Sequence, residues 1–216
     1  AISHIYNLKK KNSNKTIINL LKKFPDKGRN RYDLLNLDLE IESIFYSKII
    51  VNKIKKFFVG KLPEDKIRLG FADFQVLVMM PNTKKEYLGW HQDSAYFHYS
   101  RKNLTNLVVW TPFSMISSNV NGSLDLIAKS HKKGSVTHIE NNYINRKKNL
   151  LAKRGKLYID ETKINLKDKV TTKIKSGESL IFDANTIHRT SVNNNNSNDI
   201  RFTLIARYKF LNKLMI

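Results

Sequence analysis

The spacing of hydrophobic residues changes once along the chain, close to residue 60. Before that point apolar residues recur at helical spacing, over residues 16–24 and again over residues 37–59. Pro25 ends the first stretch, because proline disrupts the hydrogen bonding of a helix interior. The second stretch has a wide apolar face, so we expect it to pack against a large surface such as a β-sheet. Residues 1–60 are therefore predicted to form a helical N-terminal part.

From Arg68 onward the period becomes two, which is typical of β-strands with one buried face. The turn-forming pairs Asn121-Gly122 and Ser176-Gly177, and the asparagine run 193–196, separate the short segments. The expected strands are residues 74–80, 106–113, 123–127, 171–174, 179–183, 187–192 and 200–208. Many short strands after a helical region predict a mainly β fold, a barrel or jelly roll with helices packed outside it.

One segment fits neither pattern. Residues 141–169 are charged and irregular, with basic residues gathered between 146 and 156. A long insertion between strands is often a functional loop, and a disordered, solvated loop is an equally good interpretation. We find no internal repeat and no linker that would separate domains. The prediction is a single domain over residues 1–216, with the β core in residues 68–210.

The composition narrows the chemistry that is available. With 216 residues, of which 41% are hydrophobic, the chain is long enough to bury a core of its own. It has no cysteine, which excludes disulfides, thiolate nucleophiles and cysteine-ligated zinc or iron–sulfur sites. Any metal must be held by histidine and carboxylate side chains. Neither a run of about 18 apolar residues nor the apolar core of a signal peptide occurs, so we expect a cytoplasmic protein without a membrane partner.

The net charge of +21 allows two interpretations. One is binding to nucleic acid or another polyanion. The other is a biased composition, because 76 of the 216 residues are lysine, asparagine or isoleucine and only nine are arginine. The lysines are spread along the chain rather than gathered in one arm, which favours the second interpretation. We therefore expect a small-molecule substrate, to which an anionic group would be suited, and no nucleic-acid partner.

A metal site is suggested by His91 and Asp93, which lie two positions apart. On an extended segment their side chains point to the same side and can chelate one metal ion. A third ligand must come from elsewhere, and His188, at the start of a predicted strand, is the best candidate. Two histidines and one carboxylate form the facial triad of non-haem Fe(II) oxygenases, which leaves coordination positions for a bidentate cosubstrate and O₂.

A cosubstrate such as 2-oxoglutarate needs a cation for its distal carboxylate. Arg201 follows His188 by 13 residues and alternates with Thr203 on one face of the last predicted strand. Arginine binds a carboxylate through two parallel hydrogen bonds, and the threonine hydroxyl can add a third donor. Arg207 lies on the same face and is the alternative candidate for an ion pair there.

In five segments and two single residues, the chain resembles the phytanoyl-CoA dioxygenase family of Fe(II)/2-oxoglutarate-dependent oxygenases. These similarities run in the family's order over residues 68–210 and are residues 90–96, 108–113, 121–124, 130–134 and 177–183, then His188 and Arg201. The resemblance implies a double-stranded β-helix with helices packed against one sheet. It also implies His91, Asp93 and His188 as iron ligands and Arg201 as the 2-oxoglutarate anchor. Where the family usually has Pro-Gly-Ser-His, this chain has residues 128–131 as Ala-Lys-Ser-His.

Other residues near these motifs are assigned further roles. The resemblance places Trp110 near the cosubstrate, with a core position as the alternative. Gln75 is polar within an apolar strand and is expected to point into the barrel, toward cosubstrate or substrate. Gln92 is interpreted as structural, and His138 as a surface residue without a metal partner. The aromatic residues around the metal motif, Tyr96 among them, are interpreted as ordinary packing rather than a substrate pocket.

The expected activity is Fe(II)- and 2-oxoglutarate-dependent hydroxylation of a small-molecule C–H bond, with consumption of O₂ and release of succinate and CO₂. Two further functions remain open from the sequence. One is a metal-binding, cupin-like protein without 2-oxoglutarate chemistry. The second is an oxygenase that acts on nucleic acid, for which the basic residues 146–156 are the motivation.

Overall fold

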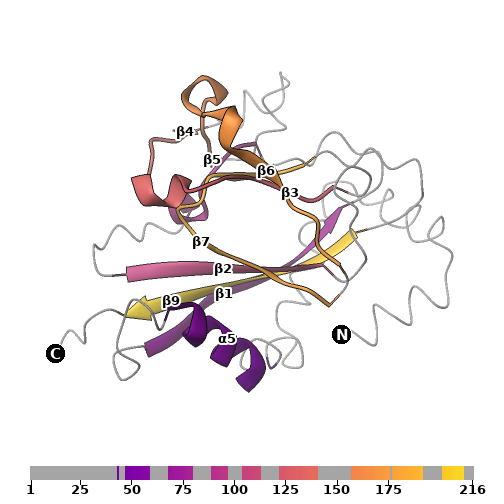
Figure 1. The fold of residues 1–216 in the computed structure, drawn as a ribbon. Helices are drawn as coiled ribbons and strands as arrows, with labels where there is room; N and C mark the ends of the chain where they lie inside the picture. Colours follow the sequence, from indigo (N-terminus) through magenta and orange to yellow (C-terminus); the bar gives the residue numbers. More distant parts are fainter. Residues whose placement is uncertain are drawn as a thin grey trace, which may run out of the picture.

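The computed structural model describes Ser43 and residues 47–58, 68–79, 89–96, 104–112, 122–140, 157–175, 177–191 and 201–211. The helix predicted over residues 16–24 lies outside these ranges. Two antiparallel sheets face each other and form the body of the molecule (Figure 1). In the part of the chain that is described, no helix is long and apolar enough to cross a membrane.

The larger sheet has four strands in the order β1-β9-β2-β7. They are β1 (Arg68–Met79), β9 (Arg201–Leu211), β2 (Leu104–Pro112) and β7 (Leu180–Asp183). The last strand, β9, pairs with β1 on one side and with β2 on the other. Because β9 is central, side chains on its inner face lie in the middle of the barrel.

The smaller sheet has three strands in the order β6-β3-β8. They are β6 (Lys169–Thr171), β3 (Leu124–Ile127) and β8 (His188–Thr190). A single antiparallel bridge between His91 and His188 adds the segment around residue 91 beside β8. A separate pair of short strands, β4 (Ile139–Glu140) and β5 (Leu157–Tyr158), lies at the edge of the molecule.

The path of the chain through these sheets is that of a jelly roll. It leaves the larger sheet after β1, passes residue 91 in the smaller sheet, and returns for β2. It then runs through β3 and β6 in the smaller sheet, β7 in the larger, β8 in the smaller, and ends with β9 in the larger. This confirms the predicted double-stranded β-helix, and each of the seven predicted strands has a counterpart.

The apolar side chains that face each other across the two sheets form the core between them. A buried cluster joins residues of both sheets: Val108, Trp110, Leu124, Ile174, Phe182, Ala184 and Ile205. Burial of a large apolar side chain contributes about 1.5–3 kcal/mol. The alternation of these residues with polar ones is the pattern from which the strands were predicted.

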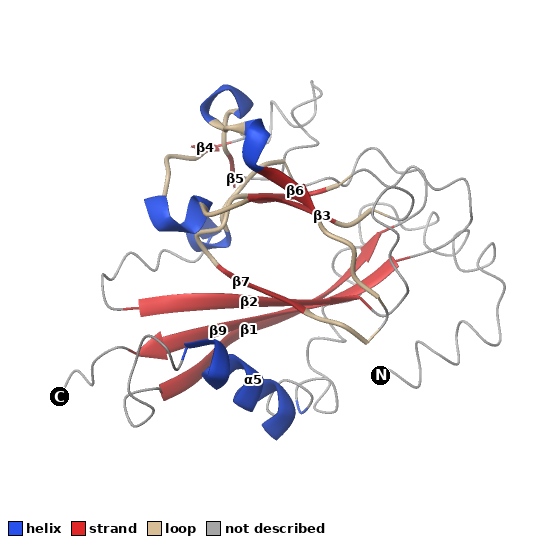
Figure 2. Cartoon of the chain, in the orientation of Figure 1, coloured by secondary structure: helices blue, strands red, loops and turns tan. Residues whose placement is uncertain are grey.

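Helix α5 (Lys48–Phe58) falls within the predicted helix 37–59. Ser47 precedes it and accepts a hydrogen bond from the backbone N–H of Ile50 at 3.4 Å, as N-cap residues do. Lys55 and Lys56 lie in the last turn, where cations interact favourably with the helix dipole. Ile54 is fully buried, and Figure 2 shows the helix on the side of the larger sheet that faces away from the smaller one.

The description of residues 141–169 as irregular is wrong for its second half. Strand β5 is followed by the 3₁₀ helices η6 (Glu161–Lys163) and η7 (Leu166–Asp168). Ile159 and Ile164 are buried in a small cluster with Trp90, so this part of the segment is folded against the body of the protein. Residues 141–156 lie outside the described ranges. Two more 3₁₀ helices, η3 (Asp93–Tyr96) and η4 (Ser130–Lys133), form turns near the smaller sheet.

Candidate metal centre

The antiparallel bridge between His91 and His188 places two imidazoles side by side. Each residue donates its backbone N–H to the carbonyl of the other, at 2.9 Å in both directions. Residues paired in this way have their side chains on the same face of the sheet. The ring centroids are accordingly 4.2 Å apart, and both side chains are buried.

Asp93 completes the group. Its Oδ1 atom lies 3.5 Å from Nε2 of His91 and 3.6 Å from Nε2 of His188. The three ligand atoms all lie within 4.8 Å of one another, and the carboxylate is buried. The start of η3 at Asp93 turns the chain directly after the bridge, which brings this carboxylate over the two rings. The structure therefore brings together all three of the predicted metal ligands.

The backbone fixes the orientation of both rings. Nδ1 of His91 lies 2.7 Å from the carbonyl oxygen of Gly89, and Nδ1 of His188 lies 2.9 Å from that of Thr186. Because a carbonyl oxygen only accepts, each Nδ1 is the donor, and the lone pair of a neutral ring is then on Nε2. Both Nε2 atoms face Asp93, as metal-ligating histidines require.

The electrostatics of the group also suit a cation. Burial alone would raise the pKa of the Asp93 carboxyl, but the charge of Arg207 and the two neighbouring imidazoles outweigh it and hold that pKa well below its ordinary value. Burial, and then the neighbouring His91, lower the pKa of His188 to about 4. The group consequently offers one charged carboxylate and a neutral His188 imidazole near neutral pH, the protonation states that bind metal.

Arg207 is a direct partner of this group. Its Nε donates to Oδ2 of Asp93 at 2.8 Å, on the opposite side of the carboxylate from the histidines. The alternation along the last strand had placed Arg207 on the same face as Arg201 and so made it a candidate for an ion pair. Its partner could not be found from the sequence, because the two residues of the pair are 114 positions apart.

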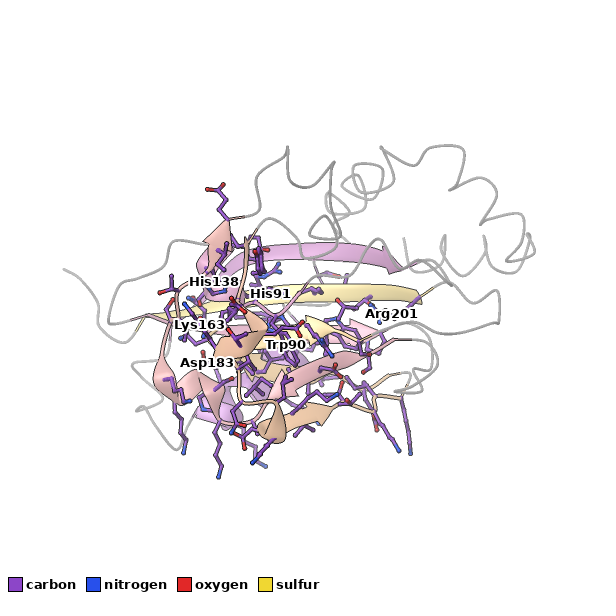
Figure 3. The ribbon with its side chains drawn as sticks, turned by 90° about the horizontal axis from the view of Figure 1, so that it is seen from above. Trp90, His91, His138, Lys163, Asp183 and Arg201 are labelled. Atoms are coloured by element: carbon purple, nitrogen blue, oxygen red, sulfur yellow. The ribbon has the colours of Figure 1, made fainter. Side chains whose placement is uncertain are left out.

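The predicted cosubstrate residues lie further along the inner face of β9. Arg201 is buried, donates from Nη1 to the carbonyl of Gly122, and its Cζ lies 5.4 Å from the centroid of the Trp110 ring. Thr203 is fully buried, and its Oγ1 has no hydrogen-bond partner among the residues that the structure describes. Figure 3 labels Arg201 and His91 and shows them at separate places along the barrel. A buried guanidinium beside an unsatisfied hydroxyl suits a carboxylate ligand.

Trp110 and Gln75 differ in how much of their surroundings the structure describes. Trp110 is buried in the main core cluster, and its ring also faces Arg201. The core position is therefore observed, and a contact of Trp110 with the cosubstrate stays a prediction. Gln75 pairs with Ile205 in the register of β1 and β9, but its side chain lies outside those described. Its role in the site stays a prediction.

Gln92, the residue between two of the predicted ligands, ties the metal loop to the rest of the protein. Its side chain is fully buried and donates to the carbonyls of Gly134 at 2.8 Å and Asn185 at 2.6 Å. Its Oε1 accepts the backbone N–H of Val136 at 2.8 Å. All of the amide's polar atoms are thus used, as the structural interpretation of Gln92 requires.

His138, expected to be a surface residue, is half-buried, and both of its ring nitrogens are hydrogen-bonded to the backbone. Its Nε2 accepts the backbone N–H of Gln92 at 3.0 Å, and its Nδ1 donates to the carbonyl of Val136 at 2.8 Å. Figure 3 shows His138 next to His91. The sequence carried no signal for this contact, because the two hydrogen-bonded residues are 46 positions apart.

Tyr96 packs against the metal group and is partly buried. Its ring meets that of His91 edge to face at 5.8 Å. Its hydroxyl donates to the carbonyl of Leu157 at 3.0 Å and accepts the backbone N–H of the same residue at 3.2 Å. Tyr96 therefore holds β5 against the metal loop, which supports the packing interpretation.

The jelly roll and its buried two-histidine, one-carboxylate group together define the class of non-haem metal proteins to which Fe(II) oxygenases belong. In agreement, the phytanoyl-CoA dioxygenase (PhyH) family matches residues 27–203 of the chain. The protein belongs to this family, as the sequence resemblance implied. The cofactors expected from the sequence, Fe(II), 2-oxoglutarate and O₂, agree with the family and with the donor set of the site.

Two solved structures illustrate the similarity of the fold. EvdO2 from Micromonospora carbonacea var. aurantiaca, in complex with 2-oxoglutarate, aligns with a TM-score of 0.59 and 16% identity, over 81% of this chain and 65% of its own. The apo form of the non-haem monooxygenase ThoJ aligns with a TM-score of 0.50 and 18% identity, over 74% of this chain and 54% of its own. This chain thus spans slightly less than two thirds of EvdO2, and the likeness establishes the fold. No curated protein sequence is significantly similar to the chain.

Proposed function

We propose that this protein is an Fe(II)- and 2-oxoglutarate-dependent dioxygenase that hydroxylates a C–H bond of a small molecule. The observation that carries the proposal is the convergence of His91, Asp93 and His188 within 4.8 Å inside a jelly-roll barrel. Two alternatives are a cupin-like metal protein without 2-oxoglutarate chemistry and an oxygenase that acts on nucleic acid. An Fe(II) and 2-oxoglutarate titration separates the first from the proposal, and a turnover assay separates the second.

In this proposal the three ligand residues hold Fe(II) through the two Nε2 atoms and Oδ1 of Asp93. Bound Fe(II) supplies the activation of O₂, coupled to oxidative decarboxylation of 2-oxoglutarate. The chain supplies the geometry. The carbonyls of Gly89 and Thr186 keep both rings turned toward the metal position, and burial of all three ligands limits the access of water.

Arg201 is assigned as the anchor of the distal carboxylate of 2-oxoglutarate. Its guanidinium is buried and stacked near Trp110, so a carboxylate that meets it is drawn out of water as well. Thr203, two positions along the same inner face, has a buried hydroxyl that lacks a partner and can donate to the same group. This pair would hold and orient the distal carboxylate of the cosubstrate.

The test is an anaerobic titration of the metal-free protein with Fe(II) and then 2-oxoglutarate, followed by visible absorption. A weak charge-transfer band that requires both additions is the expected result. Iron bound at one equivalent without such a band would leave a metal-binding, cupin-like protein and contradict the proposed activity. Succinate release, measured with small molecules and separately with nucleic acids, then identifies the class of substrate.

Two variants test whether the absorption band depends on the assigned metal ligands. His188→Ala removes a ligand and is expected to abolish both the band and succinate release. His131→Ala removes a half-exposed histidine of η4 that is not part of the metal group, and is expected to leave the band unchanged. Full activity in purified His188→Ala protein would exclude the assigned metal centre.

A further inference from the structure

The two oxygens of the Asp93 carboxylate have different partners. Oδ1 faces the Nε2 atoms of His91 and His188, at 3.5 and 3.6 Å. Oδ2 accepts the Nε–H of Arg207 at 2.8 Å. Because Oδ2 is directed toward Arg207 and Oδ1 toward both imidazoles, Oδ1 is the oxygen that is placed to bind a metal. Asp93 therefore presents a single ligand atom.

Arg207 also changes the charge of the ligand set. The Asp93 carboxylate carries one negative charge and the Arg207 guanidinium one positive charge, so the pair is neutral. The remaining two ligands are imidazoles, which bind metal in their neutral form. A divalent metal bound to these residues would keep its two positive charges, in a buried place where charges interact more strongly than in water.

We propose that Arg207 is a positioning residue that restricts Asp93 to one ligand atom and cancels its charge, so that the metal favours an anionic co-ligand. This inference rests on the proposed function, which provides such a co-ligand in 2-oxoglutarate. It assigns Arg207 a task different from that of Arg201, because Arg207 contacts a metal ligand and Arg201 lies apart from the metal group. Arg207 acts through Asp93 and through its charge, without touching the reacting atoms.

The chain contains a second arginine–aspartate pair that serves as a control. Arg189 donates from Nε to Oδ2 of Asp125 at 3.0 Å, and this aspartate is buried as well. Arg189 follows His188 on β8, so its side chain points to the other face of the smaller sheet. Arg189 also lies 3.7 Å from Glu161, and its side chain is 30% exposed against 12% for Arg207. Substitution of Arg189 breaks an arginine–aspartate pair and costs stability, without changing the charge on the inner side of the barrel.

The experiment measures two affinities by anaerobic calorimetry, that of the metal-free protein for Co(II) and that of the Co(II)-loaded protein for oxalate. Oxalate is a small dianion that chelates a metal without needing the distal carboxylate site. In Arg207→Gln we expect Co(II) to bind at least as tightly as in the wild type, because the repulsive charge is gone. Oxalate is expected to bind about tenfold more weakly, because the metal is then partly neutralised by Asp93.

Two further variants separate charge from loss of structure. Arg207→Lys keeps the charge, so its oxalate affinity should stay within about threefold of the wild type. Arg189→Gln should leave both affinities within about twofold, even if it lowers the melting temperature. A structural lesion would weaken the binding of metal and oxalate together, whereas the proposed role moves them in opposite directions.

Each outcome bears on the inference. An oxalate affinity that falls no more in Arg207→Gln than in Arg189→Gln overturns it. A tenfold loss of oxalate affinity in Arg207→Lys also overturns the inference. If Arg207→Gln does not fold, the oxalate affinity of Arg207→Lys is the deciding measurement. Failure of the wild type to bind Co(II) overturns both the inference and the proposed function. If the wild type binds oxalate but not 2-oxoglutarate, the proposed function fails, and the role of Arg207 is still decided by the oxalate comparison.

Discussion

His91 and His188 form one hydrogen-bonded pair across antiparallel backbone, and this pairing sets the distance between two of the three predicted metal ligands. The residues are far apart in the sequence, but each donates its N–H to the other's carbonyl at 2.9 Å. The metal centre is thereby built into the hydrogen-bond ladder of the smaller sheet. Its geometry is as rigid as that of the sheet itself, which suits a site that must hold a metal in a fixed orientation.

The role of the paired histidines is tested by their removal. We expect His91→Ala and His188→Ala to lose Co(II) binding by more than about 100-fold, because two ligands on one face do not complete a facial site. The backbone bridge needs no side chain, so far-UV circular dichroism should stay like that of the wild type. Calorimetry with Co(II) checks this expectation, and retained high-affinity binding in either variant would contradict it.

Loss of Asp93 should have a second effect that loss of a histidine lacks. Asp93→Ala removes the buried carboxylate that the Arg207 guanidinium contacts at 2.8 Å, and the Arg207 side chain is only 12% exposed. Breaking a buried ion pair from one side costs about 3–5 kcal/mol. Urea unfolding of the metal-free proteins should therefore show Asp93→Ala to be clearly less stable than His188→Ala. The double variant Asp93→Ala/Arg207→Met should recover part of the loss, and an absence of recovery would show that the pair is not its cause.

Because the side-chain amide of Gln92 is buried and hydrogen-bonded, we expect its replacement to lower the stability of the protein. Gln92→Leu keeps the volume but leaves two carbonyls and one backbone N–H without their partner. Each unsatisfied buried group costs about 1–3 kcal/mol, so we expect a loss of at least about 2 kcal/mol in the free energy of unfolding. Gln92→Glu, which keeps the acceptor, is a partial control. Equal stability of Gln92→Leu and the wild type in urea would show that solvent satisfies these groups instead.

We expect Arg201→Ala to weaken the binding of 2-oxoglutarate and to leave metal binding unchanged. Removal of the guanidinium should raise the 2-oxoglutarate concentration needed for half-maximal succinate release by at least about tenfold, since a charged hydrogen bond is worth about 1.5–3 kcal/mol. Co(II) affinity should be unchanged, because Arg201 lies apart from the metal ligands. An unchanged requirement for 2-oxoglutarate would show that another cation binds its distal carboxylate.

The metal-free protein should lose stability on acidification in two steps. The pKa of His188 is lowered from 6.5 to about 4, so between these values the unfolded state binds more protons, and stability falls as the pH decreases from about 6.5 to 4. The pKa of Asp93 is also lowered, and its contribution is lost below its ordinary value of 3.8. Urea unfolding in the presence of a chelator, at several pH values, measures the first step. Burial also lowers the pKa of His138, which adds to the same step, so His188→Asn should show a smaller first step rather than none. Identical pH profiles for the two proteins would assign the step to groups other than His188.

Several features could be predicted because they depend on local pattern. The period of two indicated the strands, since one buried face imposes alternation wherever a strand lies. The two-residue spacing of His91 and Asp93, and the position of His188 at the start of a strand, indicated the donor set. The alternation of Arg201, Thr203 and Arg207 along β9 placed them on one inner face, which the register of the sheet agrees with.

Other features depended on contacts between distant segments. The Arg207–Asp93 contact, the side-chain hydrogen bonds of Gln92 and the contact of His138 with the Gln92 backbone join residues between 42 and 114 positions apart. Polar contacts at that range leave no periodic trace in a sequence. The order of residues 157–169 was missed because their charged surface hides a few buried apolar positions, such as Ile159 and Ile164. The sequence by itself determined the fold class and which side chains can bind a metal, because those follow from alternation and residue chemistry. Only the tertiary structure decided how the site is charged and oriented, because burial and hydrogen bonding depend on which distant segments the barrel brings together.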